Sequence, residues 1–258
     1  MSAHREDVLR ELGLTPVWRL RTPGKTVSNP AVTAEAAIAP ALSAEPTIVR
    51  GLPKIPPLDA RGMQIATFEW PQLKDSVAGC VACPLHKGRT KTVFGVGDEE
   101  ADWMFVGEGP GAEEDAKGEP FVGQAGKLLD NMLAAIKLKR GRNVYIANVV
   151  KCRPPGNRNP ESGEAAQCEP YLHRQIALIK PRLIIALGKV AAVNLLKRDA
   201  AVASMRGKVH QYQGIPLIVT YHPAYLLRSL PEKAKAWADL CFAVETMQGL
   251  QSGKRVPM

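Results

Sequence analysis

The chain has 258 residues, of which 45% are hydrophobic, so it is long enough for one substantial domain with a buried core. Lys and Arg outnumber Asp and Glu by 34 to 25, and most of this excess lies after position 64, where there are 26 basic and 19 acidic residues. Such a positive charge suits a polyanionic partner such as nucleic acid. The sequence has no apolar run of about 18 residues and no apolar stretch near its charged N-terminus, which argues against a membrane span and a secretory signal and predicts a cytoplasmic protein.

Residues 1–64 are expected to stand apart from the main domain. A short helix is predicted over residues 4–13, ending at Gly13. Seven prolines and few aromatic residues follow between Thr22 and about Arg61, a composition typical of a flexible linker. An extended arm packed on the domain is the alternative, and the helix is a candidate site for an unknown protein partner.

Residues 65–250 are predicted to form one α/β domain, followed by a tail at 251–258. In chain order the pattern predicts strands over 103–106, 144–147, 183–187 and 217–219, and helices over 127–136, 161–179, 189–196 and 232–247. Pro170 is expected to break or start a helix. The alternation predicts a three-layer α/β/α sandwich with a central, mainly parallel four-stranded sheet.

Three segments rich in functional groups each follow a predicted strand, namely residues 107–111, 148–159 and 222–228. Ligands of such sheets bind beyond the carboxyl ends of the strands. The three segments are therefore expected to build one site.

Four cysteines have a spacing that suits a metal centre. Cys80 and Cys83 form a C-x2-C pair, and Cys152 and Cys168 follow at a distance. In a reducing compartment such cysteines are more plausible as ligands than as disulfides, and four thiolates suit zinc or a four-iron cluster. The spacing weighs mildly against zinc, and scattered core cysteines are the alternative. Cys241 is expected to be a core residue.

Three single residues, two of them in the strand-end segments, suggest recognition of a flat, polar ring. Phe121 lies in a Gly/Pro-rich loop, where its ring could stack on a base or anchor the loop in the core. Asn148 ends a strand, and its amide offers both a donor and an acceptor, although a turn-forming role is open. His222 could donate to a developing oxyanion or be structural.

The last two strand-end segments also carry candidate contacts for a nucleic acid. Arg153 and Arg158 lie in the loop that contains Cys152. After His222 come Tyr225, Leu226 or Leu227 as candidate wedges into a duplex and Arg228 as a candidate phosphate contact, with an ordinary helix start as the alternative.

Taken together, these motifs resemble the family 4 uracil-DNA glycosylases, the iron–sulfur branch of the uracil glycosylase superfamily. The matching segments occur in the family's order over roughly residues 65–248, and they are GEGPGAEED at 107–115, GEPFVGQAGKLLDNML at 118–133, NVVKCRPPGNRNP at 148–160, PRLIIALGKVAA at 181–192 and HPAYLLR at 222–228.

The resemblance implies a role for each matching residue. Cys80, Cys83, Cys152 and Cys168 would bind a [4Fe–4S] cluster. Phe121 would stack on a uracil flipped out of DNA, Asn148 would read its edge, and His222 would bind its O2. Gly107, Glu108 and Gly109 would line the pocket. Glu108, Glu114 and Asn157 would support catalysis, the last two as a hydrogen-bonded pair.

The implied activity is hydrolysis of the N-glycosidic bond of uracil in single- or double-stranded DNA by a monomer, the first step of base-excision repair. Gly109 stands where family 1 enzymes carry a water-positioning aspartate, and Gly111 stands where they carry a tyrosine that blocks thymine, a gap that Glu114 could fill. The segment between Cys152 and Cys168 contains no histidine, which predicts free turnover and no covalent adduct.

Three alternatives remain. A non-enzymatic iron–sulfur or zinc protein could bind nucleic acid with the same cysteines and charge, but it gives Phe121, Asn148 and His222 no joint task. A broader glycosylase, similar to family 5, would act on other deaminated bases. A polymerase-associated protein is disfavoured because the chain is too short for a polymerase domain.

Overall fold

The computed structural model describes residues 59–252 of the chain. The helix predicted over residues 4–13, the predicted linker up to residue 58 and the end of the predicted tail lie outside the described residues. The described fold begins with helix α2 (Ala60–Ile65), which the side chain of Asp59 caps by accepting a hydrogen bond from the N–H of Gly62. Gly62 and Ile65 are buried, so this helix is packed onto the domain although most of it precedes the expected boundary at residue 65.

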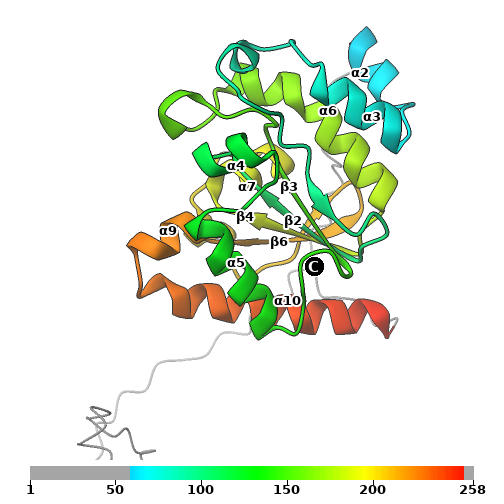
Figure 1. Cartoon of the computed structure of the whole chain (residues 1–258). Coiled ribbons are helices and arrows are strands. Elements are labelled where there is room, and N and C mark those ends of the chain that lie inside the picture. Colours follow the sequence, from blue (N-terminus) through cyan, green and yellow to red (C-terminus); the bar gives the residue numbers. More distant parts are fainter. Residues whose placement is uncertain (1–58, 253–258) are drawn as a thin grey trace, which may run out of the picture. The chain divides into compact units, whose positions relative to one another are not determined.

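A six-stranded sheet with the order β1-β3-β2-β4-β6-β5 forms the centre of the domain (Figure 1). The strands are β1 (Val96–Gly97), β2 (Trp103–Gly107), β3 (Val144–Asn148), β4 (Leu183–Leu187), β5 (His210–Tyr212) and β6 (Ile215–Thr220). The four inner strands are parallel, and the two edge strands are antiparallel to their neighbours. The expected parallel four-stranded sheet is confirmed, and two short edge strands extend it.

Helices cover both faces of the sheet, as the three-layer prediction requires (Figure 1). The α-helices after α2 are α3 (Trp70–Ala78), α4 (Ala112–Lys117), α5 (Gln124–Ala135), α6 (Ser162–Ile179), α7 (Lys189–Leu196), α8 (Val202–Met205), α9 (Pro223–Arg228) and α10 (Glu232–Gln251), and the 3-10 helices are η1 (Pro84–Lys87) and η2 (Pro155–Asn157). Alternate strand residues point to opposite faces. Met104 and Val106 pack in a cluster with α3, α6 and α7, whereas Phe105 packs in another with α5 and α10.

The predicted break or start at Pro170 is wrong, because α6 runs through this residue without interruption. A proline inside a helix removes one hydrogen bond, here the one to the carbonyl of Ala166, and costs about 3 kcal/mol or more. The same helix buries Tyr171, Leu172 and Ile176 in the core, and this burial offsets the cost.

The parallel strands bring their carboxyl ends to one edge of the sheet. Gly107 lies beside Asn148, and Leu187 lies beside Thr220. The loops that follow these four residues therefore start close together, as expected from the order of strands and helices. Of the helices in the described part of the chain, none combines the length and the apolar character that a membrane crossing requires.

Candidate active site

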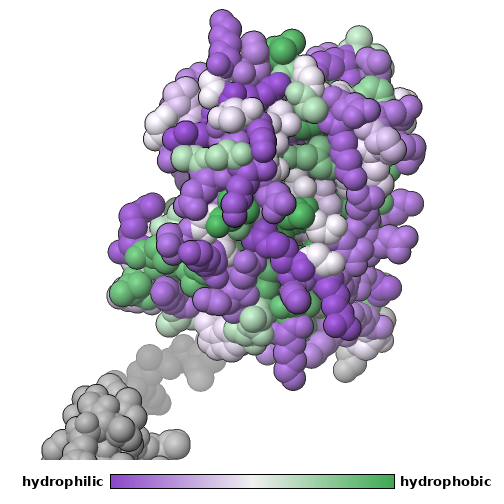
Figure 2. All heavy atoms as spheres, viewed as in Figure 1, coloured by the Kyte–Doolittle hydropathy of each residue, from purple (hydrophilic) through white to green (hydrophobic). Residues whose placement is uncertain are grey.

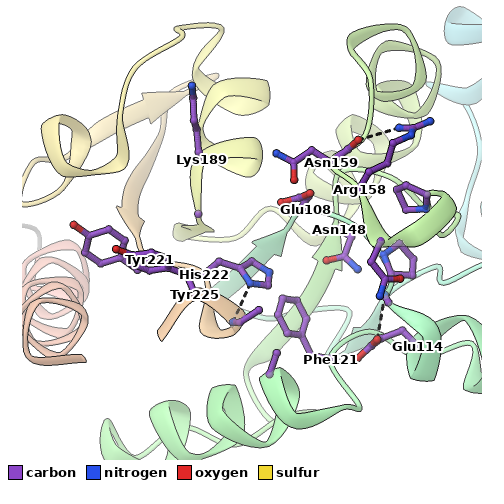
Figure 3. A pocket seen from close by; sticks show the side chains of 18 of the residues that line it. Glu108, Glu114, Phe121, Asn148, Arg158, Asn159, Lys189, Tyr221, His222 and Tyr225 are labelled. Carbon is purple, nitrogen blue, oxygen red and sulfur yellow. Dashed lines mark hydrogen bonds between the residues drawn. The ribbon is translucent and has the colours of Figure 1, made fainter. Parts of the chain in front are cut away.

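A cavity of about 550 Å³ opens at the carboxyl edge of the sheet, a size that suits a small-molecule group (Figure 3). It brings together most of the residues predicted from the sequence. Those that line it are Glu108, Gly109, Glu114, Phe121, Asn148, Asn157, Arg158, His222, Tyr225 and Arg228. They come from the ends of β2, β3 and β6 and the segments that follow these strands, including α4, the loop before α5 and α9, so the predicted convergence of the three segments is confirmed.

The ring of Phe121 and the amide of Asn148 lie side by side only because Gly107 has no side chain. A Cβ atom at Gly107 would lie 2.4 Å from Asn148 Oδ1 and 2.6 Å from Phe121 Cζ. Phe121 has a φ of 55°, and its carbonyl accepts a hydrogen bond of 2.8 Å from Arg140 Nη2. A Cβ at Gly126 in α5 would lie 1.8 Å from the same carbonyl oxygen, so α5 can pack this closely only with glycine there.

Asn148 carries an unsatisfied hydrogen-bonding group at the cavity. The residue is 2% exposed, and its Oδ1 is buried without a hydrogen-bond partner among the described residues. Leaving such an acceptor unpaired costs about 1–3 kcal/mol, so native structures rarely tolerate it without a functional reason. A ligand with an N–H group directed at Asn148 would satisfy this oxygen.

His222 presents a neutral imidazole to the cavity. It caps α9, and its Nδ1 accepts a hydrogen bond of 3.1 Å from the N–H of Ala224. This bond leaves the ring proton on Nε2. Burial and, to a smaller extent, the positive charge of Arg228 lower the pKa of His222 to about 4, and the carboxylate of Glu114 opposes them only weakly.

The position of His222 depends on close packing from two sides. Gly188 has a φ of 88°, and a Cβ there would lie 2.9 Å from the Cβ of His222. The ring centroids of His222 and Phe121 are 5.5 Å apart with an angle of 30° between the planes. Figure 3 shows both rings beside the amide of Asn148, so the three predicted recognition groups share one site.

Glu114 and Asn157 line the cavity with other partners than each other. Glu114 Oε1 accepts hydrogen bonds from the N–H groups of Val122 (2.9 Å) and Gly123 (3.0 Å), and its Oε2 accepts one from Gly111 (3.1 Å). Asn157 Oδ1 accepts a bond of 2.7 Å from Arg153 Nε. The carboxylate therefore ties the loop after β2 to the loop of Phe121, and the expected Glu114–Asn157 pair is replaced by these contacts.

Glu108 lines the cavity beside Gly109. Burial raises the pKa of its carboxyl group, which favours the protonated form compared with an exposed glutamate. A Cβ at Gly109 would lie 2.7 Å from Val150 Cγ2, so a side chain at that position would have to displace its neighbour.

The candidate DNA contacts in α9 differ in how far their side chains are exposed to solvent. Tyr225 is 38% and Leu227 42% exposed, and Figure 2 shows an apolar patch over this part of the surface. Leu226 is only 1% exposed and packs with Met132 and Leu240. The prediction that Leu226 contacts DNA is therefore wrong for this conformation, because its side chain fills the core between α5 and α10.

Arg153 and Arg158 are each held by a nearby side chain, Arg153 by one within its own loop and Arg158 by one at the start of α6. Arg158 lines the cavity, and its guanidinium forms an ion pair of 2.7 Å with Glu164. Arg153 is half-buried and donates to Asn157, and it is not among the residues that line the cavity.

Sequence reasoning missed three residues that follow strand ends and line the cavity, namely Gly188, Lys189 and Tyr221. Lys189 is an exposed cation paired with Asp199 at 2.9 Å. The ring of Tyr221 lies 5.2 Å from that of Tyr225. The sequence could have indicated these residues, because those that follow the predicted strands 183–187 and 217–219 belong to the same carboxyl edge of the sheet.

The four predicted ligand cysteines line a second, smaller cavity. Cys80 and Cys83 lie between α3 and η1, Cys152 follows β3, and Cys168 lies in α6. Within residues 59–252, no three His, Cys, Asp or Glu side chains lie close enough together to hold a single metal ion. Cys241 is in α10, outside this cavity.

Hydrogen-bond donors surround the cysteine sulfurs. Arg89 Nη1 lies 3.3 Å from Cys152 Sγ, and the N–H of Lys151 lies 3.3 Å from Cys168 Sγ. Burial raises the pKa of Cys168 to about 12, so a thiolate at this position requires a strong positive partner such as a metal. The donor set therefore fits an iron–sulfur cluster, whose sulfurs commonly accept such bonds.

Comparison with known proteins agrees with this geometry. The family model described as "Uracil DNA glycosylase superfamily" matches residues 94–241. The type-4 uracil-DNA glycosylase of Archaeoglobus fulgidus is 47% identical over 58% of this chain and 79% of its own length. The type-4 enzyme of Pyrobaculum aerophilum is 44% identical over 66% of this chain and 90% of its own length. That of Thermotoga maritima is 45% identical over 61% of this chain and 82% of its own length. The chain thus belongs to the uracil DNA glycosylase superfamily and, within it, to the type-4 uracil-DNA glycosylases.

Proposed function

We propose that this protein removes uracil from DNA by hydrolysing its N-glycosidic bond. The observation that carries the proposal is the Oδ1 of Asn148, which is buried beside the ring of Phe121 and has no hydrogen-bond partner within residues 59–252. Uracil has an N3–H group that can donate to this oxygen, whereas cytosine has a bare N3 acceptor at the same place. A site built around a buried hydrogen-bond acceptor rejects a base that leaves it unpaired.

The chemistry follows from the state of His222. The target nucleotide must rotate out of the stack at a cost of a few kcal/mol, and stacking on Phe121 offsets part of this cost. Cleavage leaves negative charge on uracil, and the Nε2–H of a neutral His222 can donate to the O2 atom that carries it. This donor favours the departing anion over bound uracil.

Residues that follow β2 bear on two further points, the position of the attacking water and the exclusion of thymine. Gly109 has no side chain that could hold the water, and Glu108 is the carboxyl group of the loop after β2 that lines the cavity. A Cβ at Gly111 would lie 2.7 Å from Glu114 Oε2, so the Glu114 carboxylate fills the space next to this glycine. We assign the exclusion of thymine to Glu114 on this basis.

The same proposal includes a [4Fe–4S] cluster held by Cys80, Cys83, Cys152 and Cys168, which line one cavity. By holding the cluster, these cysteines would tie the segment before β1 to the loop after β3 and to α6. We also propose that residues 65–250, together with helix α2 in front of them, form the catalytic domain of a monomer, and that the residues before Asp59 serve as an arm with a role of its own. The residues Tyr225, Leu227 and Arg228 of α9 are proposed to contact DNA.

A single uracil in an oligonucleotide tests the activity. The purified holoenzyme should convert it to an alkali-labile abasic site, and Asn148→Ala should lower kcat/KM by about 100-fold or more. The matched control is Asn194→Ala in α7, whose amide binds the carbonyl of Val190 away from the cavity. Binding of the oligonucleotide without any abasic product would instead support a non-enzymatic nucleic-acid-binding protein.

A further inference from the structure

A fully buried lysine lies behind the amide that faces the cavity. Lys151 is 1% exposed, and its Nζ donates hydrogen bonds to the main-chain carbonyl of Asn148 at 3.0 Å and to Gln175 Oε1 at 2.6 Å. Lysine is almost never fully buried unless its ammonium group is paired. No step of the proposed reaction uses this residue, so its burial needs another explanation.

Gln175 is itself held rigidly in α6. It is fully buried, and its Nε2 donates to the carbonyl of Phe94 at 2.9 Å and lies 3.4 Å from the hydroxyl of Tyr145. The amide therefore offers its oxygen to Lys151 in a fixed direction. The ammonium group in turn has a fixed position from which to bind Asn148.

The backbone of Lys151 is fixed as well. Its N–H donates to Cys168 Sγ at 3.3 Å, and its carbonyl accepts a bond of 2.8 Å from the N–H of Val93. The side chain then turns back to Asn148, three residues earlier in the chain. This arrangement closes the turn at the end of β3 into a ring that joins the cysteine cavity to the backbone of Asn148.

We propose that Lys151 is a positioning residue that holds Asn148 in register with the base, an inference that rests on the proposed function. Without the ammonium group, the carbonyl of Asn148 and the oxygen of Gln175 would both lose a partner in the core. The backbone at the end of β3 would then relax, and the Asn148 amide would move with it. A displacement of about 1 Å at a reacting group lowers the rate by about 100-fold.

A double-mutant cycle tests this inference. In the iron-loaded enzyme, Lys151→Met should lower kcat/KM for uracil-DNA by about 100-fold, whereas the same change in an Asn148→Ala background should cost less than about threefold, because two residues that act through one group are not additive. Crystal structures provide a readout independent of activity. The Asn148 amide should be displaced or present in several positions in Lys151→Met.

Two further variants keep the test decisive. Gln175→Met removes the other partner of the ammonium group and replaces Lys151→Met as the test if that variant does not fold. It should lower kcat/KM in the same direction, by a smaller factor. Ile179→Ala truncates a buried side chain of α6 at the opposite edge of the sheet and controls for a general loss of stability. Iron content and visible absorbance establish that each variant retains its cluster.

The outcomes separate this inference from the proposed function. Equal losses from Lys151→Met with and without Asn148, or an undisturbed Asn148 in the variant crystal, would overturn the positioning role while wild-type activity stands. A wild-type enzyme without uracil excision would overturn the proposed function, and the crystal structures would still decide whether Lys151 holds Asn148.

Discussion

The single side chain with the most informative ionisation is His222. Its pKa is about 4 in the folded protein against 6.5 for the ordinary value, chiefly because burial disfavours the imidazolium. Between about pH 6.5 and about pH 4, the unfolded chain therefore binds a proton at His222 that the folded chain does not. The free energy of unfolding must fall as the pH falls through this window, and the contribution is constant above it.

Urea denaturation can measure this effect. From about pH 7 to about pH 5, the wild-type protein should lose about 2 kcal/mol more stability than His222→Gln, which has no group to protonate. The pH dependence that the two proteins share comes from all other groups and cancels in the comparison. Identical losses would mean that His222 is solvated or already charged in the folded state.

At the scale of residues, the sequence predicted the recognition groups better than their supports. Asn148 and His222 lie at strand ends, Phe121 lies in the loop between α4 and α5, each matches a family motif, and all three line the cavity. The sequence pattern did not single out Lys151, because a sequence does not show that a lysine is buried. Leu226 was misassigned for the same reason, since its neighbour Leu227 is the one that faces solvent.

At the scale of elements, predictability followed length and apolar character. The inner strands are continuous apolar runs buried along β2, β3 and β4, and such runs identify strands of a parallel sheet. The edge strand β1 has two residues and β5 has three, too few for any pattern. The short helices α4 and α9 lie in segments rich in Gly, Pro and charged residues, where local pattern resembles that of loops.

The cysteine cavity joins three elements that the sheet alone does not hold together, namely the segment between α3 and η1, the loop after β3 and helix α6. We expect Cys83→Ala to yield protein with little iron, no visible cluster absorbance and a clearly lowered Tm, since removing one ligand leaves three sulfurs, two of them buried, without their charge partner. Cys241→Ala is the matched control and should retain both iron and colour. A fully active, iron-free Cys83→Ala protein would rule out a structural cluster.

At the scale of the whole molecule, the two cavities meet in one short segment. Asn148 faces the larger cavity, Cys152 lines the smaller one, and Lys151 contacts residues of both. In the proposed function, base recognition and cofactor binding would therefore depend on the same turn after β3. A perturbation of either site is expected to reach the other through the backbone of these five residues.

Two exposed cations at the edge of the cavity indicate where the molecule is expected to bind the DNA backbone. Lys189 and Arg228 line the cavity and are exposed, whereas Arg182 precedes β4 at the opposite edge of the sheet and pairs with Asp102 at 3.0 Å. Each phosphate contact releases counterions and adds about 0.9 to the slope of log affinity against log salt concentration. Arg228→Gln should therefore weaken binding of uracil-DNA and reduce that slope by about 1, as measured by fluorescence anisotropy over a salt series. Arg182→Gln removes the same charge from the far edge and should leave the slope unchanged. Equal slopes for all three proteins would place the DNA elsewhere on the surface.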